Sequence, residues 1–186
     1  MQIIHDSDFL AWAAEAGLMP DPRYLGTQQL VYPNLPDYWS GWAPPRGPGE
    51  PTKFVGTIIS LIGNGPLRIR MRGGGVFGSA TADSERERAL RAATLAAGIP
   101  ADTRGALMVD PAEYQVLCNL AVAFLSYGYC VGTDLEIVTA DRGACLMLSH
   151  HYELLGHFCS RDRLSEFDVA MIAAWYGDKE EEENEK

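Results

Sequence analysis

Apolar residues recur along the chain in two rhythms, one typical of helices and one typical of strands. In five stretches they return every three or four residues, whereas shorter runs alternate with polar residues or are apolar throughout. The expected helices cover residues 6–17, 54–62, 84–98, 111–124 and 163–176. The expected strands cover residues 29–32, 67–72, 106–109, 136–140, 144–149 and 153–158. Three consecutive strands near the end predict an α+β fold, with a mainly antiparallel sheet packed against about five helices.

One helix has clear signals at both ends. Ser84 followed by Glu87 has the spacing of a capping box, in which each side chain satisfies a backbone N–H of the first turn. Gly98 allows the left-handed turn that ends a helix, and Pro100 cannot continue it. We therefore expect this helix to begin next to Ser84 and to stop at Gly98.

The strand at residues 67–72 reads Leu-Arg-Ile-Arg-Met-Arg, a strict alternation of apolar residues and arginines. Successive side chains of a strand point to opposite faces of the sheet, so the three apolar side chains share one face and the three arginines share the other. This pattern predicts a strand with one buried and one solvated face, in an antiparallel or edge position.

Residues 33–51 are rich in proline and glycine, and proline lacks the N–H that helices and sheets need. We expect a long loop without regular structure. Tyr38, Trp39 and Trp42 lie within it, although a purely flexible linker needs no large aromatic side chains. Two interpretations remain open: these aromatic residues contact a partner, or they pack against the core of their own domain.

The chain is expected to form one globular domain over residues 1–176, because 186 residues, 47% of them hydrophobic, can bury a single core. Residues 177–186 contain six acidic residues, two basic residues and no apolar one, so we expect a disordered acidic tail. Residues 1–15 lack the basic start of a secretory signal. The longest apolar stretch, residues 116–131, is interrupted by polar residues and is shorter than the roughly 20 residues of a spanning helix.

These features predict a cytoplasmic protein that does not associate with membranes. The four cysteines, at positions 118, 130, 145 and 159, lie in apolar segments, and a domain of this size needs no covalent cross-links. We expect all four to be free thiols.

The net charge of −10 is unevenly distributed. Residues 46–104 contain nine basic and five acidic residues, whereas residues 105–176 contain three basic and nine acidic ones. An acidic chain does not bind nucleic acid nonspecifically, because that binding requires a positive surface against the phosphates. The distribution instead favours a protein partner with a basic surface.

The arginine strand and the glycines after it form a candidate anion-binding region. Guanidinium groups and backbone amides both bind phosphate or carboxylate. The residues concerned are Arg68, Arg70, Arg72, Gly73, Gly74 and Gly75. The competing interpretation pairs the arginines with carboxylates of the chain itself. Gly73, Gly75 and Gly78 also have the spacing of a dinucleotide-binding loop, but such a loop follows a strand buried on both faces, which this alternation does not predict.

Zinc-binding residue types are concentrated near the end of the chain, but no two of them have a recognised ligand spacing. The candidates are Cys145, His150, His151, His157 and Cys159. Cysteine in a strand is usually a small buried hydrophobic residue, and histidine at a corner is usually solvated. We therefore expect neither a metal nor a cofactor, and no spacing points to a nucleophilic triad.

The sequence favours a protein-binding module over an enzyme, and specifically an inhibitor or immunity-type protein that neutralises a toxin or another basic partner. The candidate contact residues are Tyr38, Trp39, Trp42, Asp134, Glu136 and Glu153. The alternative is an enzyme or ligand-binding domain that recognises an anionic small molecule through residues 68–75. The sequence leaves the oligomeric state open.

Overall fold

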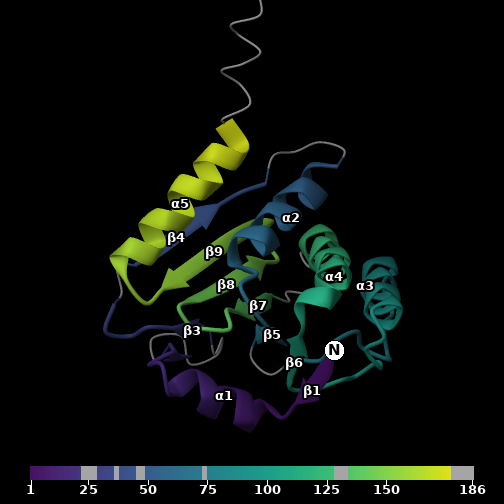
Figure 1. Ribbon diagram of the computed structural model, residues 1–186. Helices are drawn as coiled ribbons and strands as arrows, with labels where there is room; N and C mark the ends of the chain where they lie inside the picture. The colour runs from purple at the N-terminus through teal and green to yellow at the C-terminus, as the bar shows by residue number, and fades with distance from the viewer. Residues whose placement is uncertain (22–28, 36–37, 45–48, 73–74, 128–133, 177–186) are drawn as a thin grey trace, which may run out of the picture.

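The α+β architecture predicted from the sequence is confirmed by a computed structural model. It describes the chain except for residues 22–28, 36–37, 45–48, 73–74, 128–133 and 177–186. Within the described residues, five α-helices accompany a seven-stranded sheet and a two-stranded one (Figure 1). The expected disordered tail falls outside the described residues.

Every pair of neighbouring strands in the large sheet is antiparallel. In spatial order the strands are β1 (Gln2–Ile4), β6 (Ala106–Val109), β5 (Leu67–Met71), β7 (Leu135–Val138), β8 (Ala144–Ser149), β9 (Glu153–Phe158) and β4 (Trp39–Trp42). The expected meander of three consecutive strands is present as β7, β8 and β9. β1 was not predicted, because three residues are too few to show a period.

Four of the five helices lie on one side of the large sheet, and α1 lies on the other. The five helices are α1 (Asp6–Ala14), α2 (Glu50–Ile62), α3 (Glu85–Ala96), α4 (Tyr114–Tyr127) and α5 (Arg161–Tyr176). Figure 1 shows α2, α4 and α5 across one face of the sheet, with α3 beside α4. Apolar side chains of these four helices form the main core with Leu67, Ile69 and Met71, the apolar half of the β5 alternation.

The helix boundaries follow from local chemistry. The predicted capping box forms, with the Glu87 N–H donating to Ser84 Oγ and the Ser84 N–H donating to the Glu87 carboxylate. A second box joins Asp110 and Glu113 across the short turn η2 (Pro111–Glu113), directly before α4. α2 begins at Glu50, earlier than expected, because Pro51 fits the first turn of a helix, where an N–H has no partner.

The prediction of a solvated face on β5 was wrong. A second layer, formed by α1 and the β2 (Met19–Pro20)–β3 (Leu30–Val31) pair, packs against that face through a smaller cluster around Phe9 and Leu30. Arg70 is 0% exposed beneath this layer. A period of two assigns residues to opposite faces of a strand, but it does not show whether a face is covered.

The prediction that residues 33–51 lack regular structure was also wrong, because β4 lies within them and pairs with β9. Residues 38–43 contain no proline, and aromatic residues favour strands. β4 is an edge strand of the sheet, the place where a proline-flanked strand is tolerated. The surrounding prolines therefore limit this strand without preventing it.

Candidate functional site

The arginines of β5 meet carboxylates of the neighbouring strand β7 on the face covered by α1. Register places Arg70 opposite Glu136, and Arg70 Nε lies 2.6 Å from Glu136 Oε2. Both side chains are 0% exposed. The other carboxylate oxygen, Oε1, accepts a hydrogen bond of 2.9 Å from the backbone N–H of Leu30 in β3. This ion pair therefore connects the large sheet to the layer that covers it.

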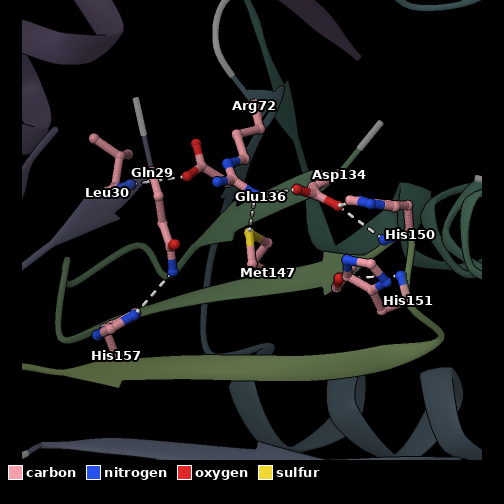
Figure 2. A network of polar contacts seen from close by, with 10 residues as sticks. Gln29, Leu30, Arg72, Asp134, Glu136, Met147, His150, His151 and His157 are labelled. Carbon is pink, nitrogen blue, oxygen red and sulfur yellow. Dashed lines mark hydrogen bonds and ion pairs between the residues drawn. The ribbon is translucent and has the colours of Figure 1, made fainter. Parts of the chain in front are cut away.

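A second ion pair lies at the end of the same two strands, where Arg72 directly follows β5 and Asp134 directly precedes β7. Figure 2 shows Asp134 between Arg72 and His150. Arg72 pairs with Asp134 Oδ2, while Asp134 Oδ1 lies 2.8 Å from the His150 backbone nitrogen and 2.6 Å from its Nδ1. The Asp134 side chain is 2% exposed. This cluster joins β5 and β7 to the corner after β8.

The two carboxylates respond differently to burial. Burial raises the pKa of Glu136, and the charge of Arg70 and the Leu30 N–H only partly oppose this effect. Burial also raises the pKa of Asp134, but the hydrogen bonds from His150 and Arg72 outweigh it, so that this pKa lies below its ordinary value. Asp134 is therefore firmly ionised, whereas the charge of Glu136 depends on Arg70.

Arg68 is engaged differently. Its guanidinium carbon lies 3.6 Å from the centroid of the Trp12 ring of α1, and that of Arg142 lies 5.6 Å from the same centroid. Arg142 Nη1 also lies 2.6 Å from Glu15 Oε2. Burial and the nearby Arg142 charge lower the pKa of Arg68. This stack joins α1 to β5 and to the turn between β7 and β8.

The expected anion-binding region is thus built into the protein's own contacts. Arg70 and Arg72 face carboxylates, and Arg68 faces an aromatic ring. The Gly75 N–H donates to the Arg72 carbonyl oxygen at 3.4 Å. Gly73 and Gly74 lie outside the described residues. Of the two interpretations of the sequence, pairing with the chain's own carboxylates holds for Arg70 and Arg72. The pairs lie inside the molecule and not on a solvated face.

The structure does not bring the cysteines and histidines near the end of the chain together as a metal site. Cys145 is buried, Cys159 is exposed, and His157 Nε2 lies 3.0 Å from Gln29 Nε2 (Figure 2). The His150 and His151 rings lie 4.0 Å apart at the corner after β8. Among the described residues, no three Cys, His, Asp or Glu side chains form a group that could hold a metal ion. The thiols of Cys118, Cys145 and Cys159 are free, and Cys130 lies outside the described residues.

An exposed aromatic surface lies at the other end of the sheet, on β4 and β9. The Trp39 side chain is 55% exposed and stands opposite His157 in the register. Gly41, two residues further along β4, stands opposite Leu155. A Cβ at Gly41 would lie 3.4 Å from Trp39 Cζ3 and 3.5 Å from Leu155 Cδ2, so the indole lies beside the bare glycine backbone. We call Trp39, Gly41, Leu155 and His157 the edge platform.

The other predicted contact residues have different positions. Tyr38 and Trp42 pack against the main core, and Trp42 Nε1 donates to Ser40 Oγ at 2.9 Å and to Asp168 Oδ1 of α5 at 3.1 Å. Asp134 and Glu136 are buried in the ion pairs and do not lie on the surface.

Glu153 lies on the same face of β9 as Leu155 and His157, and it is half-buried. Of the predicted contact residues, Trp39 is exposed, whereas Tyr38, Trp42 and Glu153 are half-buried. Because side chains alternate along a strand, Trp39 and Gly41 lie on one face of β4 and Ser40 and Trp42 on the other. The sequence would have predicted this division if residues 39–42 had been assigned to a strand.

No helix among the described residues is long and apolar enough to cross a membrane. Comparison of the chain with protein-family models, curated proteins and solved structures gives no match.

Proposed function

We propose that this chain is a protein-binding module that captures a basic partner through the edge platform. The observation that carries the proposal is Trp39, a large aromatic side chain that is 55% exposed on an edge strand. Tryptophan is the residue type most enriched among side chains that dominate binding energy, because it buries a large apolar area with few rotatable bonds. Trp39 lies beside Gly41 on a hydrogen-bonded strand, so its ring is positioned to form the main contact with a partner.

The edge position adds a second means of attachment. Within the described part of the sheet, β4 has one neighbouring strand, β9, so its other side is available to an extended segment of a partner. Such a segment would gain backbone hydrogen bonds along β4 while its side chains contact Trp39. The flanking prolines prevent longer pairing between copies of the chain.

The net charge of −10 supports a basic partner, because opposite charges speed encounter and disfavour acidic competitors. Half-buried Glu153 on the platform side adds a local carboxylate. An inhibitor or immunity-type protein acting in the cytoplasm is the specific form that we propose. Recognition of an anionic small molecule through residues 68–75 is less favoured, since Arg70 and Arg72 already contact carboxylates.

The proposal is tested by capturing the partner from cells that contain the protein and measuring its affinity for four variants. Trp39→Ala should weaken binding about 30-fold or more, the effect of losing a dominant contact residue. Ile3→Ala is the matched control, because Ile3 is 53% exposed on β1, the opposite edge strand. It should change the affinity less than about threefold.

Gly41 provides a variant that keeps the tryptophan. Gly41→Val should weaken binding because the added methyl groups displace the indole ring, whereas Gly41→Ala makes only ordinary contacts and should bind normally. Binding should also weaken as salt is raised. Failure to capture a stoichiometric partner, or equal affinity of Trp39→Ala and wild type, contradicts the proposal.

A further inference from the structure

A pocket of about 190 Å³ lies on the helical side of the sheet, between the end of α2, the first half of α5 and the β7–β8 turn. Its apolar lining includes Ile62, Ala144, Phe158 and Phe167, which belong to the main core and are at most 7% exposed. The Phe158 and Phe167 ring centroids lie 5.2 Å apart. The core therefore opens here onto an apolar cavity, separate from the edge platform.

The wall formed by the β7–β8 turn is held firmly by hydrogen bonds. Thr139 Oγ1 donates to Asp141 Oδ1 at 2.7 Å, and the Gly143 N–H donates to the same oxygen at 2.9 Å. The second oxygen of Asp141 pairs with Arg163 of α5, whose guanidinium lies against Gly143 at 3.1 Å from the position of a Cβ there. These contacts join the β7–β8 turn to α5 at the wall of the pocket.

The volume of the pocket limits its occupant to a small ring. A 150 Å³ apolar cavity accommodates benzene, and ligand pockets for drug-sized molecules are larger than about 300 Å³. A pocket of about 190 Å³ therefore fits one aromatic ring and a short substituent.

The polar groups at the rim determine the charge of that substituent. Arg163 and Asp141 neutralise each other. Glu166, one turn before Ala170 on α5, also lines the pocket and has no hydrogen-bond or ion-pair partner among the described residues. Its carboxylate is therefore the charge at the rim that is available to a ligand.

We propose that this pocket binds a small aromatic ammonium compound, with the ring packed against Phe158 and Phe167 and the ammonium group at Glu166. The ring gains apolar contact with the lining, and the ammonium donates to the carboxylate at the rim. This binding is independent of partner capture at the edge platform.

The test uses 2-phenylethylammonium as the probe, with neutral 2-phenylethanol and anionic phenylacetate of similar size for comparison. Titration followed by NMR should shift the amide signals of residues 139–144 and 163–170, with the ammonium compound binding most tightly. Glu166→Gln should weaken it about fivefold and abolish its advantage over 2-phenylethanol. Glu85→Gln on α3 changes the net charge equally, far from the pocket, and should leave the affinity unchanged.

Ala170 lines the pocket, so the ring of Ala170→Phe should fill the cavity and abolish binding of all three compounds. This result would show that the compounds bind in the pocket. If this variant does not fold, the comparison of Glu166→Gln with Glu85→Gln still decides the question of charge. The proposal is overturned if 2-phenylethylammonium does not bind, if phenylacetate binds as tightly, or if Glu166→Gln has no effect.

Discussion

Arg70 and Glu136 show how individual residues specify the arrangement of layers in this protein. Both side chains are fully buried, and removing two charges from water costs several kcal/mol that their attraction only partly offsets. In return, the pair fixes the register of β5 against β7, and Glu136 also accepts the Leu30 N–H. We interpret the pair as a device for specificity of packing more than for stability.

Breaking this pair should destabilise the protein far more than removing it as a whole. Glu136→Leu leaves the Arg70 charge buried without its closest partner and should lower the free energy of unfolding by about 3 kcal/mol. The double variant Arg70→Met/Glu136→Leu should be more stable than this single variant. Urea unfolding measures both.

The surface pair Glu15–Arg142 provides the control, since Glu15 is 69% exposed. Glu15→Leu should change the free energy of unfolding by less than about 1 kcal/mol. A cost for Glu136→Leu as small as that of Glu15→Leu would show that the buried pair does not have the proposed role.

Asp134 should make the stability of the fold depend on pH in the acid range. Its pKa in the folded protein lies below the ordinary value of 3.8, so the unfolded chain takes up the proton first as the pH falls. The stabilisation is therefore complete above pH 3.8 and is lost as the pH falls through the folded-state pKa.

Asp134→Asn keeps the size of the side chain but cannot titrate. Its free energy of unfolding should fall less steeply than that of the wild type below about pH 4, as measured by urea unfolding at a series of pH values. The other titrating groups are common to both proteins, so the difference between the two curves isolates Asp134. Parallel curves would contradict the assignment.

At the scale of elements, the turn between β7 and β8 joins the two layers that cover the sheet. Asp141 pairs with Arg163 of α5 on the helical side. The next residue, Arg142, has φ +58° and contacts Trp12 and Glu15 of α1 on the other side. Because Arg142 has a left-handed conformation, its side chain and that of the adjacent Asp141 point to opposite faces of the sheet.

This arrangement predicts that two arginine substitutions loosen different helices. Arg142→Ala should speed amide hydrogen exchange in α1 by up to about fivefold and leave α5 unchanged, and Arg163→Ala should do the reverse. Alanine has the same Cβ as arginine, so the backbone cost at φ +58° is retained. If either variant changed the exchange rates of α1 and α5 equally, the Arg142 contact with α1 and the Arg163 contact with α5 would not be independent.

At the scale of the whole molecule, the sheet is covered unequally. Helices α2, α4 and α5 pack on one face, with α3 beside α4, whereas α1 and the β2–β3 pair pack on the other (Figure 1). The β4–β9 end of this second face carries the exposed Trp39. The partner surface that we propose is thus the part of the sheet that the smaller layer leaves accessible.

The fold also modifies the charge polarity of the chain. Residues 46–104 carry an excess of basic residues, but Arg70 and Arg72 lie in ion pairs with Glu136 and Asp134. Each pair removes one positive and one negative charge from the outer field. The surface is therefore less polarised than the linear sequence indicates, while the net charge of −10 is unchanged.

The sequence by itself determined the elements with strong local signals. The helix after Ser84 and the strands around residues 106–109, 144–149 and 153–158 depend on capping residues and on periodicity, which neighbours in the chain specify. The α+β class followed from their order. Strand alternation also separated the arginines of β5 correctly from its apolar side chains.

Only the tertiary structure decided which surfaces are covered. Arg70 and Glu136 are separated by 66 positions, so their burial depends on strand pairing and on the layer formed by α1. Trp39 is exposed and Trp42 packs half-buried against the core because β9 pairs with a segment whose prolines suggested a loop. Local patterns record which residues share a face, whereas burial depends on distant segments that pack against that face.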